Sequence, residues 1–273
     1  MMNCAYVTFS QGAEHDDEIE VALDAWRAVG IEGRAVLWDD PEADWSEFDA
    51  AVLRSAWDYV PRRAEFLAWT RAVESRTRLL NPAATIARNT DKTYLRDMGV
   101  PTVPTYWSAA DFPEWDEYVV KPTVSAGALD TIRTADRAVA IAHAEMLAAA
   151  EGRAPMIQPY LNMVESEGET SLLYFNRRFS HAVRRNPMLA PGMTLADNAR
   201  AERRTPAADQ FDLAEQLLAT FPEDLLYARV DLVRLADGTP ALIELELTEP
   251  YLYLGYAPEA AGNLATALRE LLG

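Results

Sequence analysis

The sequence predicts an α/β fold that begins with a Rossmann-like parallel sheet. Over the first ~80 residues, short apolar strand patterns alternate with helix patterns, which is typical of βαβ units. Later in the chain, turn residues at Asn176 and at Asp237-Gly238 separate alternating runs and predict antiparallel hairpins. The 273 residues are enough for about two domains. We therefore expect a parallel-sheet domain followed by a region of mixed helices and strands.

The elements of the first domain are expected to alternate regularly. Strands are predicted at 5–9, 34–37, 50–53 and 79–80, and helices at 17–28 and 62–76. The prediction of the first helix is supported by acidic residues in its first turn and by Gly30 after its end. No GxGxxG motif follows the first strand, where the turn reads Ser10-Gln11-Gly12-Ala13. This argues against a dinucleotide-dependent oxidoreductase.

The rest of the chain follows a break at Asn81-Pro82. Helices are expected near 90–98, 136–150, 209–219 and 260–272, and strands at 118–120, 156–160, 170–175, 180–184, 227–235 and 240–247. Residues 187–206 show little periodicity and predict a long loop, a kind of segment that is often functional. We expect domains at 1–88, 89–155 and 156–273.

The composition narrows the classes of function. A formal net charge of −18 and a pI near 4.5 leave no basic footprint, which argues against a nucleic-acid partner. No apolar run approaches ~18 residues, so no membrane span is expected. The N-terminal MMNCAYVTFSQG lacks the pattern of a signal peptide. The single cysteine, Cys4, excludes an internal disulfide and a cysteine-based zinc site. The expected location is the cytoplasm.

Lysine is rare in this chain. Of the 25 basic residues, only Lys92 and Lys121 are lysines, which a coding bias toward arginine also explains. Lys121 ends an apolar strand pattern and precedes a small-residue stretch, 123–128, whose backbone N–H groups can approach phosphate oxygens. Lys92 lies near an expected helix N-terminus, where anions are favoured. Taken singly, each lysine has a solvated surface position as its alternative.

A strong turn signal, Asp237-Gly238, lies between the last two strand patterns. If these two residues form the loop, Pro240 pairs with Leu235, where its missing N–H costs no ladder bond. A slip by one residue would move every side chain to the other face, so the register decides which residues meet. One face is expected to be apolar and to pack on a core: Val230, Leu232, Ile243, Leu245 and Leu247.

In this register, the opposite face of the hairpin gathers charged residues. Asp231 lies opposite Glu244, and Arg229 lies opposite Glu246, with opposite Cβ atoms about 4.5–5.5 Å apart. Like charges at that distance are destabilising unless something offsets them. Oxygen ligands of this kind suit Mg²⁺, which binds one or two carboxylates together with substrate phosphates. The alternative is a solvated face of an edge hairpin.

Together these pieces resemble the ATP-grasp superfamily of carboxylate–amine ligases. The matching stretches, in the order of that family, are NTDKTYLRDMGVPTVPT (89–105), YVVKPTVSAGA (118–128), MIQPYL (156–161), EGETSLLY (167–174) and YARVDLV…DGTPALIELE (227–246). The resemblance implies a two-subdomain ATP-grasp fold after an N-terminal substrate domain at 1–88. The small subdomain would be 89–155, and the C-terminal subdomain with the metal site would be 156–273. ATP and Mg²⁺ are the implied cofactors.

The resemblance also implies roles for individual residues. Those implied to hold the nucleotide lie on the strands and loops around its adenosine and phosphates: Lys92, Lys121, Ser125, Ala126, Gly127, Gln158, Pro159, Tyr160, Leu161 and Glu169. The implied Mg²⁺ ligands are Asp231, Glu244 and Glu246. The implied catalytic residues, which steady phosphate or acyl-phosphate charge, are Arg229, Lys121 and Arg185.

The chain departs from the family's pattern in three places. Glu244-Leu245-Glu246 stands where the family usually has Glu-x-Asn, although glutamate can also ligate Mg²⁺. The expected phosphate loop is poor in glycine. The 187–206 stretch lacks the common Gly-Gly and carries Arg200, Arg203 and Arg204, whose roles are open.

A narrower resemblance points to the glutathione-synthetase-like subgroup, through LELTEP (245–250), LRSAWDY (53–59) and WDDP (38–41). That subgroup includes the ATP-dependent O-ureidoserine cyclase of cycloserine biosynthesis. Open α/β sheets bind ligands at the carboxyl ends of their strands, which predicts a substrate site after the strand 50–53. The residues there are Arg54, Ser55, Trp57, Asp58 and Tyr59. Ordinary packing of a strand-end loop is the alternative.

The sequence thus predicts an ATP- and Mg-dependent ligase or cyclase that acts on a small amino-acid-like substrate through an acyl phosphate. The narrower function implied by the resemblance is cyclisation of O-ureidoserine to cycloserine. An amide ligase for amino acids or peptides and a nucleotide-binding module without catalysis remain as alternatives. The oligomeric state is open, with a homodimer as one alternative.

Overall fold

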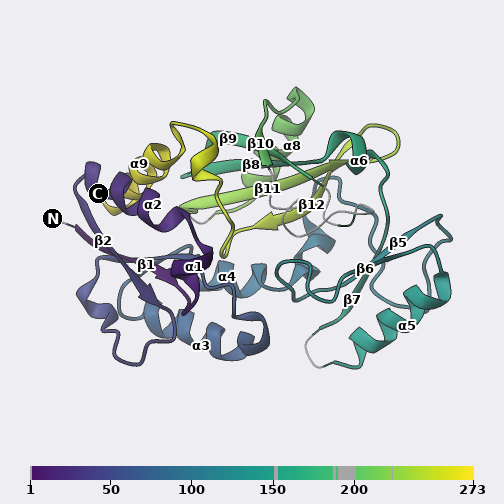
Figure 1. The fold of residues 1–273 in the computed structure, drawn as a ribbon, viewed down its shortest axis with the longest axis horizontal. Helices are drawn as coiled ribbons and strands as arrows, with labels where there is room; N and C mark the ends of the chain where they lie inside the picture. The colour runs from purple at the N-terminus through teal and green to yellow at the C-terminus, as the bar shows by residue number, and fades with distance from the viewer. Residues whose placement is uncertain (1, 151–152, 187–188, 190–200, 223) are drawn as a thin grey trace.

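The computed structural model describes residues 2–150, 153–186, 189, 201–222 and 224–273, and it contains three sheets connected by helices (Figure 1). The first sheet is parallel and has the order β2-β1-β3-β4. Its strands are β1 (Met2–Thr8), β2 (Ile31–Leu37), β3 (Ala50–Ser55) and β4 (Arg78–Leu80). The predicted α/β fold with an N-terminal parallel sheet is confirmed.

Helices connect the strands of this parallel sheet. They are α1 (Gly12–His15), α2 (Glu18–Ala28), α3 (Arg63–Glu74) and the 3-10 turns η1 (Trp45–Glu47) and η2 (Val60–Arg62). The first turn of α2 contains Glu18 and Glu20, and acidic side chains there stabilise a helix by interacting with the positive end of its dipole. No helix within the described residues is both long and apolar enough to cross a membrane.

A small antiparallel sheet lies at the far end of the molecule from the first sheet, on the right in Figure 1. Its order is β6-β5-β7, from β6 (Ile132–Thr134), β5 (Tyr118–Pro122) and β7 (Pro155–Pro159), and α5 (Arg137–Ala148) packs on it. The expected boundary after residue 155 falls inside β7. This strand completes the small sheet because it pairs with β5 along its whole length.

The third sheet is antiparallel and has the order β10-β9-β8-β11-β12. Its strands are β8 (Glu169–Phe175), β9 (Arg178–Arg185), β10 (Ala201–Arg203), β11 (Tyr227–Arg234) and β12 (Pro240–Glu246), with α6 (Met163–Glu167) and α8 (Ala208–Leu218) beside them. The expected loop 187–206 lies largely outside the described residues. Its described part is not all loop, because β10 pairs with β9.

The segment between the first two sheets differs from the expected helix at 90–98. The helix α4 (Ala83–Asn89) comes earlier, and a 3-10 helix η3 (Lys92–Asp97) follows it. The chain changes course at Asn89, whose side-chain Nδ2 donates to Leu245 O at 2.7 Å and whose Oδ1 accepts from Leu247 N at 2.8 Å. The Tyr94 hydroxyl likewise bonds the backbone of Leu245. These side chains satisfy the outer edge of β12, which would otherwise be exposed to pairing.

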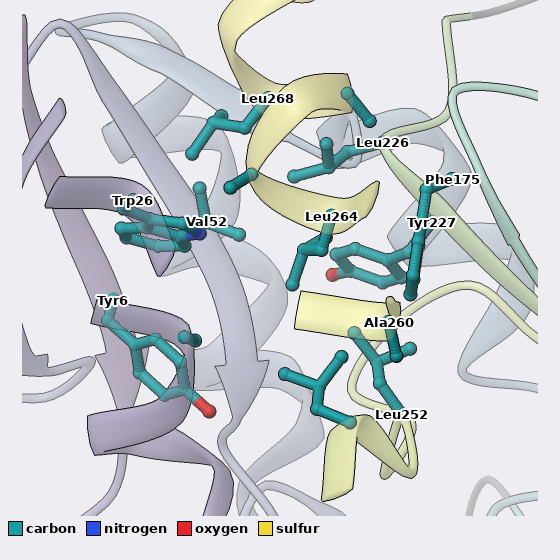
Figure 2. Close-up of a cluster of buried hydrophobic side chains, with 14 of the residues drawn as sticks. Tyr6, Trp26, Val52, Phe175, Leu226, Tyr227, Leu252, Ala260, Leu264 and Leu268 are labelled. Carbon is teal, nitrogen blue, oxygen red and sulfur yellow. The ribbon is translucent and has the colours of Figure 1, made fainter. Parts of the chain in front are cut away.

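The C-terminal helix α9 (Ala260–Leu272) joins the first sheet to the third. Figure 2 shows Leu264 and Leu268 between Trp26 and Val52 on one side and Phe175 and Tyr227 on the other. These side chains form one buried hydrophobic cluster. The stabilisation from hydrophobic burial is roughly proportional to the apolar area buried, so this shared core holds the first sheet against the third.

Acid is expected to destabilise the fold through His181. This imidazole is 2% exposed, and its Nε2 contacts Leu252 O at 3.0 Å. Burial lowers its pKa from 6.5 to about 4, because the charged form loses its hydration. Between these values the unfolded chain binds more protons than the folded one, so stability is present above pH 6.5 and is lost as the pH falls toward 4.

We expect this loss to reach about 3 kcal/mol for His181. Urea unfolding of the wild type and His181→Gln at pH 7 and pH 4.5 measures it, since the variant lacks the titrating group. His143→Gln is the matched control, because His143 is only partly buried. Equal losses of unfolding free energy in wild type and His181→Gln would contradict the prediction.

Candidate functional site

A β-bulge in the last hairpin sets the geometry of the site. Asp231 pairs with Glu244 and Arg229 with Glu246, as predicted from the sequence. The expected pairing of Pro240 with Leu235 is wrong, because Pro240 pairs with Arg234 and the register shifts between Asp231 and Leu232. The loop is longer than two residues, and Leu235 N donates to Thr239 O across it.

The bulge absorbs the extra residue, Ile243, and restores the register where the charges meet. Without it, Asp231 would face Ile243 and the carboxylates would separate. Ile243 lines a cavity together with Glu244 and packs against the small cluster of Val103, Val164 and Val233, apart from the core that contains Leu245. Bulges commonly re-aim side chains in this way next to active sites.

Three carboxylates lie together on this hairpin. Ligand atoms of Asp231, Glu244 and Glu246 all lie within 4.8 Å of one another. Burial raises the pKa of Glu246 to about 7, against the opposing charge of Arg229. Burial also acts to raise the pKa of Glu244, but the charges of Lys92 and Lys121 outweigh it and lower that pKa. A set of clustered hard oxygen donors fits Mg²⁺.

Two arginines offset part of the negative charge. Arg229 donates from Nε to Asp231 Oδ1 at 3.0 Å and from Nη2 to Glu246 Oε1 at 2.5 Å. Arg185 donates from Nη2 to Asp231 Oδ2 at 2.8 Å and to Glu169 Oε2 at 2.7 Å. These five side chains come from β8, β9, β11 and β12, so adjacent strands of one sheet build the cluster.

The two lysines have different surroundings. Lys92 Nζ lies 3.1 Å from Glu244 Oε1 and donates to Ser125 O at 2.7 Å. Burial opposes its charge, but the ion pair with Glu244 outweighs it and raises the pKa of Lys92. Lys121 has no hydrogen-bond or ion-pair partner among the described residues, and burial lowers its pKa. A partly buried ammonium without a partner is favourably placed to bind an anion.

A cavity of about 610 Å³ opens between the three sheets. The sequence-predicted residues that line it come from all three expected domains: Trp57, Tyr59, Lys92, Lys121, Ser125, Ala126, Gly127, Gln158, Pro159, Tyr160, Leu161, Glu169, Arg185, Arg229, Glu244 and Glu246. Asp231 is fully buried beneath them and belongs to the carboxylate cluster. The volume suits a ligand of nucleotide or drug size.

Three residues of the expected substrate stretch do not line this cavity. Arg54 is 1% exposed and donates to Glu18 and to Pro250 O. Ser55 donates to Thr8 Oγ1, and Asp58 accepts from Trp38 Nε1 and Arg62 Nη2. β3 ends at Ser55 and residues 57 and 58 form a turn, so these contacts, and not strand alternation, decide which side chains reach the cavity.

Several cavity residues were not singled out from the sequence. They are Asn89, Thr248, Glu249, Tyr251 and Tyr253. Four of these lie in the segment directly after Glu244-Leu245-Glu246, which starts within LELTEP. The closeness of this segment to the expected metal ligands was the signal that could have identified them. Of the arginines with open roles, Arg203 pairs with Glu259 and Arg204 with Glu167, away from the carboxylate cluster. Arg200 lies outside the described residues.

Comparison with known sequences reveals similarity over the whole chain. Residues 4–81 match the family described as the N-terminal domain of D-cycloserine synthetase DcsG. The chain is 36% identical to the cycloserine biosynthesis protein DcsG of Streptomyces lavendulae, covering 98% of each protein.

Solved structures agree with this similarity. The crystal structure of D-cycloserine synthetase DcsG matches with a TM-score of 0.90 and 35% identity, over 99% of this chain and 100% of that one. An ATP-grasp RimK domain protein of Sphaerobacter thermophilus matches with a TM-score of 0.68 at 16% identity, over 98% and 99%. A D-alanine–D-alanine ligase of Bacillus anthracis matches with a TM-score of 0.67 at 15% identity, over 100% and 97%. The last two show the shared fold.

Proposed function

This chain belongs to the family of the cycloserine biosynthesis protein DcsG and is an ATP-grasp ligase, and from that premise we propose that it closes the ring of O-ureidoserine to form cycloserine. The observation that carries the proposal is the shared cavity. Its cationic and acidic groups from the second and third sheets face Trp57 and Tyr59 of the N-terminal domain. A nucleotide and a small substrate can therefore meet in one enclosure.

The lysines would bind the nucleotide, and the carboxylate cluster would hold the metal. Lys121 and Lys92 would bind ATP phosphates as compact point charges. Asp231, Glu244 and Glu246 would hold Mg²⁺, whose charge would offset that of the phosphates. The strand end at Gln158 and the residues after it would border the adenine through backbone groups.

The reaction proceeds by activation and ring closure. A carboxylate oxygen of the substrate attacks the γ-phosphorus, and the bond to ADP breaks, leaving an acyl phosphate. The ureido nitrogen bonded to oxygen then attacks the acyl carbon, a C–N bond forms and phosphate leaves. Loss of the carbamoyl group with one water, as carbon dioxide and ammonia, completes cycloserine. The residues contribute positioning and electrostatic stabilisation, and Arg229 steadies the negative charge that develops on the acyl phosphate.

The expected result is ADP release that requires both Mg²⁺ and O-ureidoserine. The assay compares both enantiomers of O-ureidoserine with a panel of amino acids and dipeptides, and it identifies cycloserine by mass spectrometry. ADP release with a dipeptide or a pair of amino acids instead would favour an amide ligase. Saturable ATP binding without turnover across the panel would favour a nucleotide-binding module.

A further inference from the structure

The segment that follows β12 crosses from the carboxylate cluster to the N-terminal domain. Its backbone is fixed on the N-terminal side by two long-range contacts. Trp57 Nε1 donates to Glu249 O at 2.9 Å, and Arg54 Nη2 donates to Pro250 O at 2.8 Å. Glu249 is therefore held in place by its main chain, and its side chain is not needed to anchor the segment.

The side chain of Glu249 lines the cavity and has an unsatisfied buried oxygen. Its Oε2 is inaccessible to solvent and has no hydrogen-bond partner within the described part of the chain. The other acidic side chains of the cavity that the structure describes differ in this respect. Glu169 pairs with Arg185, Glu244 with Lys92 and Glu246 with Arg229. These other carboxylates each form an ion pair with a cation of the protein, whereas Glu249 forms none with any residue that the structure describes.

Burial, followed by the charge of Glu246, raises the pKa of Glu249 to about 8. Burial raises the pKa of Tyr59, and among the nearby charges that of Glu249 raises it most. Glu249 thus lies between the carboxylate cluster and the N-terminal wall of the cavity. Leaving a buried acid without a partner is costly, and a cationic ligand would remove that cost.

We propose that Glu249 receives the ammonium group of the amino-acid substrate and thereby selects substrates that carry an amine beside the reacting carboxylate. The inference rests on the proposed function and names the part of the same cavity that recognises the substrate. An amine next to the carboxylate must lie close to the γ-phosphate when the carboxylate is activated. Glu249 is three residues beyond Glu246, which places it beside that end of the cavity. Its role is recognition and positioning of the substrate.

The test compares O-ureidoserine with its desamino analogue, 3-(ureidooxy)propanoate, in the wild type and in Glu249→Gln. In the wild type, removal of the amine is expected to lower kcat/KM for the organic substrate about 100-fold, as expected for a charged hydrogen bond to a buried group. In Glu249→Gln, O-ureidoserine should lose about the same factor, while the desamino analogue should change by less than about threefold. The exposed Glu20→Gln is the control for loss of one carboxylate. A variant that slows both compounds equally would overturn the assignment.

Two further measurements separate this inference from the proposed function. Calorimetry with a non-hydrolysable ATP analogue and Mg²⁺ compares binding of the same two compounds. If the wild type binds the compound with the amine more tightly and Glu249→Gln does not, the role of Glu249 is supported. This result would stand even if neither compound supports ADP release and the proposed function fails. A wild type that binds both compounds equally overturns the role of Glu249, whether or not ADP is released.

The melting temperature of the unliganded protein gives a readout without substrate. At pH 8.5, Glu249→Gln should melt at or above the wild-type temperature, because it removes a buried carboxylate that has no partner. A clear decrease would show that the side chain supports the fold, and it would overturn the assignment as a substrate residue.

Discussion

Glu244→Gln is expected to lower the rate of ADP release by about 10³-fold while the protein stays folded. Glu244 belongs to the carboxylate cluster and lies opposite Asp231 and 3.1 Å from Lys92. The amide keeps the shape and can still accept a hydrogen bond from Lys92, but it loses the negative charge that attracts a divalent cation. The measurement is substrate-dependent ADP release over a range of Mg²⁺ concentrations, with circular dichroism as the check on folding.

Asp237→Asn is the matched control for this variant. Asp237 is an exposed carboxylate at the turn of the same hairpin, where it accepts from Thr239 N. We expect this variant to keep wild-type turnover within about twofold, as exposed substitutions away from sites usually do. Turnover of Glu244→Gln near that of Asp237→Asn would remove Glu244 from the metal site.

Local patterns were sufficient to predict the order of the elements. Strand and helix periods differ, so the alternation in the first 80 residues predicts the parallel sheet that β1 to β4 form. The Asp-Gly turn and the alternation around it predict the pairing of Asp231 with Glu244. Alternation alone does not fix where an extra residue sits. Two deviations, a longer loop and a bulge at Ile243, cancel at the charged pairs, and neither follows from the turn sequence.

Long-range contacts could not be predicted from the sequence, because they depend on which distant segments meet in the fold. Arg54 lies in β3 and Trp57 follows it closely, yet Arg54 is buried against Glu18 while Trp57 reaches the cavity. That difference depends on α2 and on the segment at Glu249, which are distant in sequence and meet only in the fold. Asn89 is a similar case, because its partners at Leu245 and Leu247 are more than 150 residues away.

Lys121→Met is expected to lower kcat/KM for ATP by about 10³-fold without loss of stability. Lys121 has no hydrogen-bond or ion-pair partner in the part of the chain that the structure describes, and burial lowers its pKa. Without a bound anion its partly buried ammonium is therefore a cost to the fold, and an anionic phosphate is the group that would stabilise it. Methionine preserves the length of the side chain and removes the charge.

The two lysines allow this prediction to be separated from a loss of structure. Lys92→Met should lower the melting temperature as well as ATP affinity, because it leaves Glu244 without its cation and removes the bond to Ser125 O. Lys121→Met should lower ATP affinity alone, and Lys121→Arg should not restore it, because a forked guanidinium does not replace a compact ammonium. Calorimetric ATP titrations and melting curves of the three variants are the measurements. A destabilised Lys121→Met with unchanged ATP affinity would assign Lys121 a structural role instead.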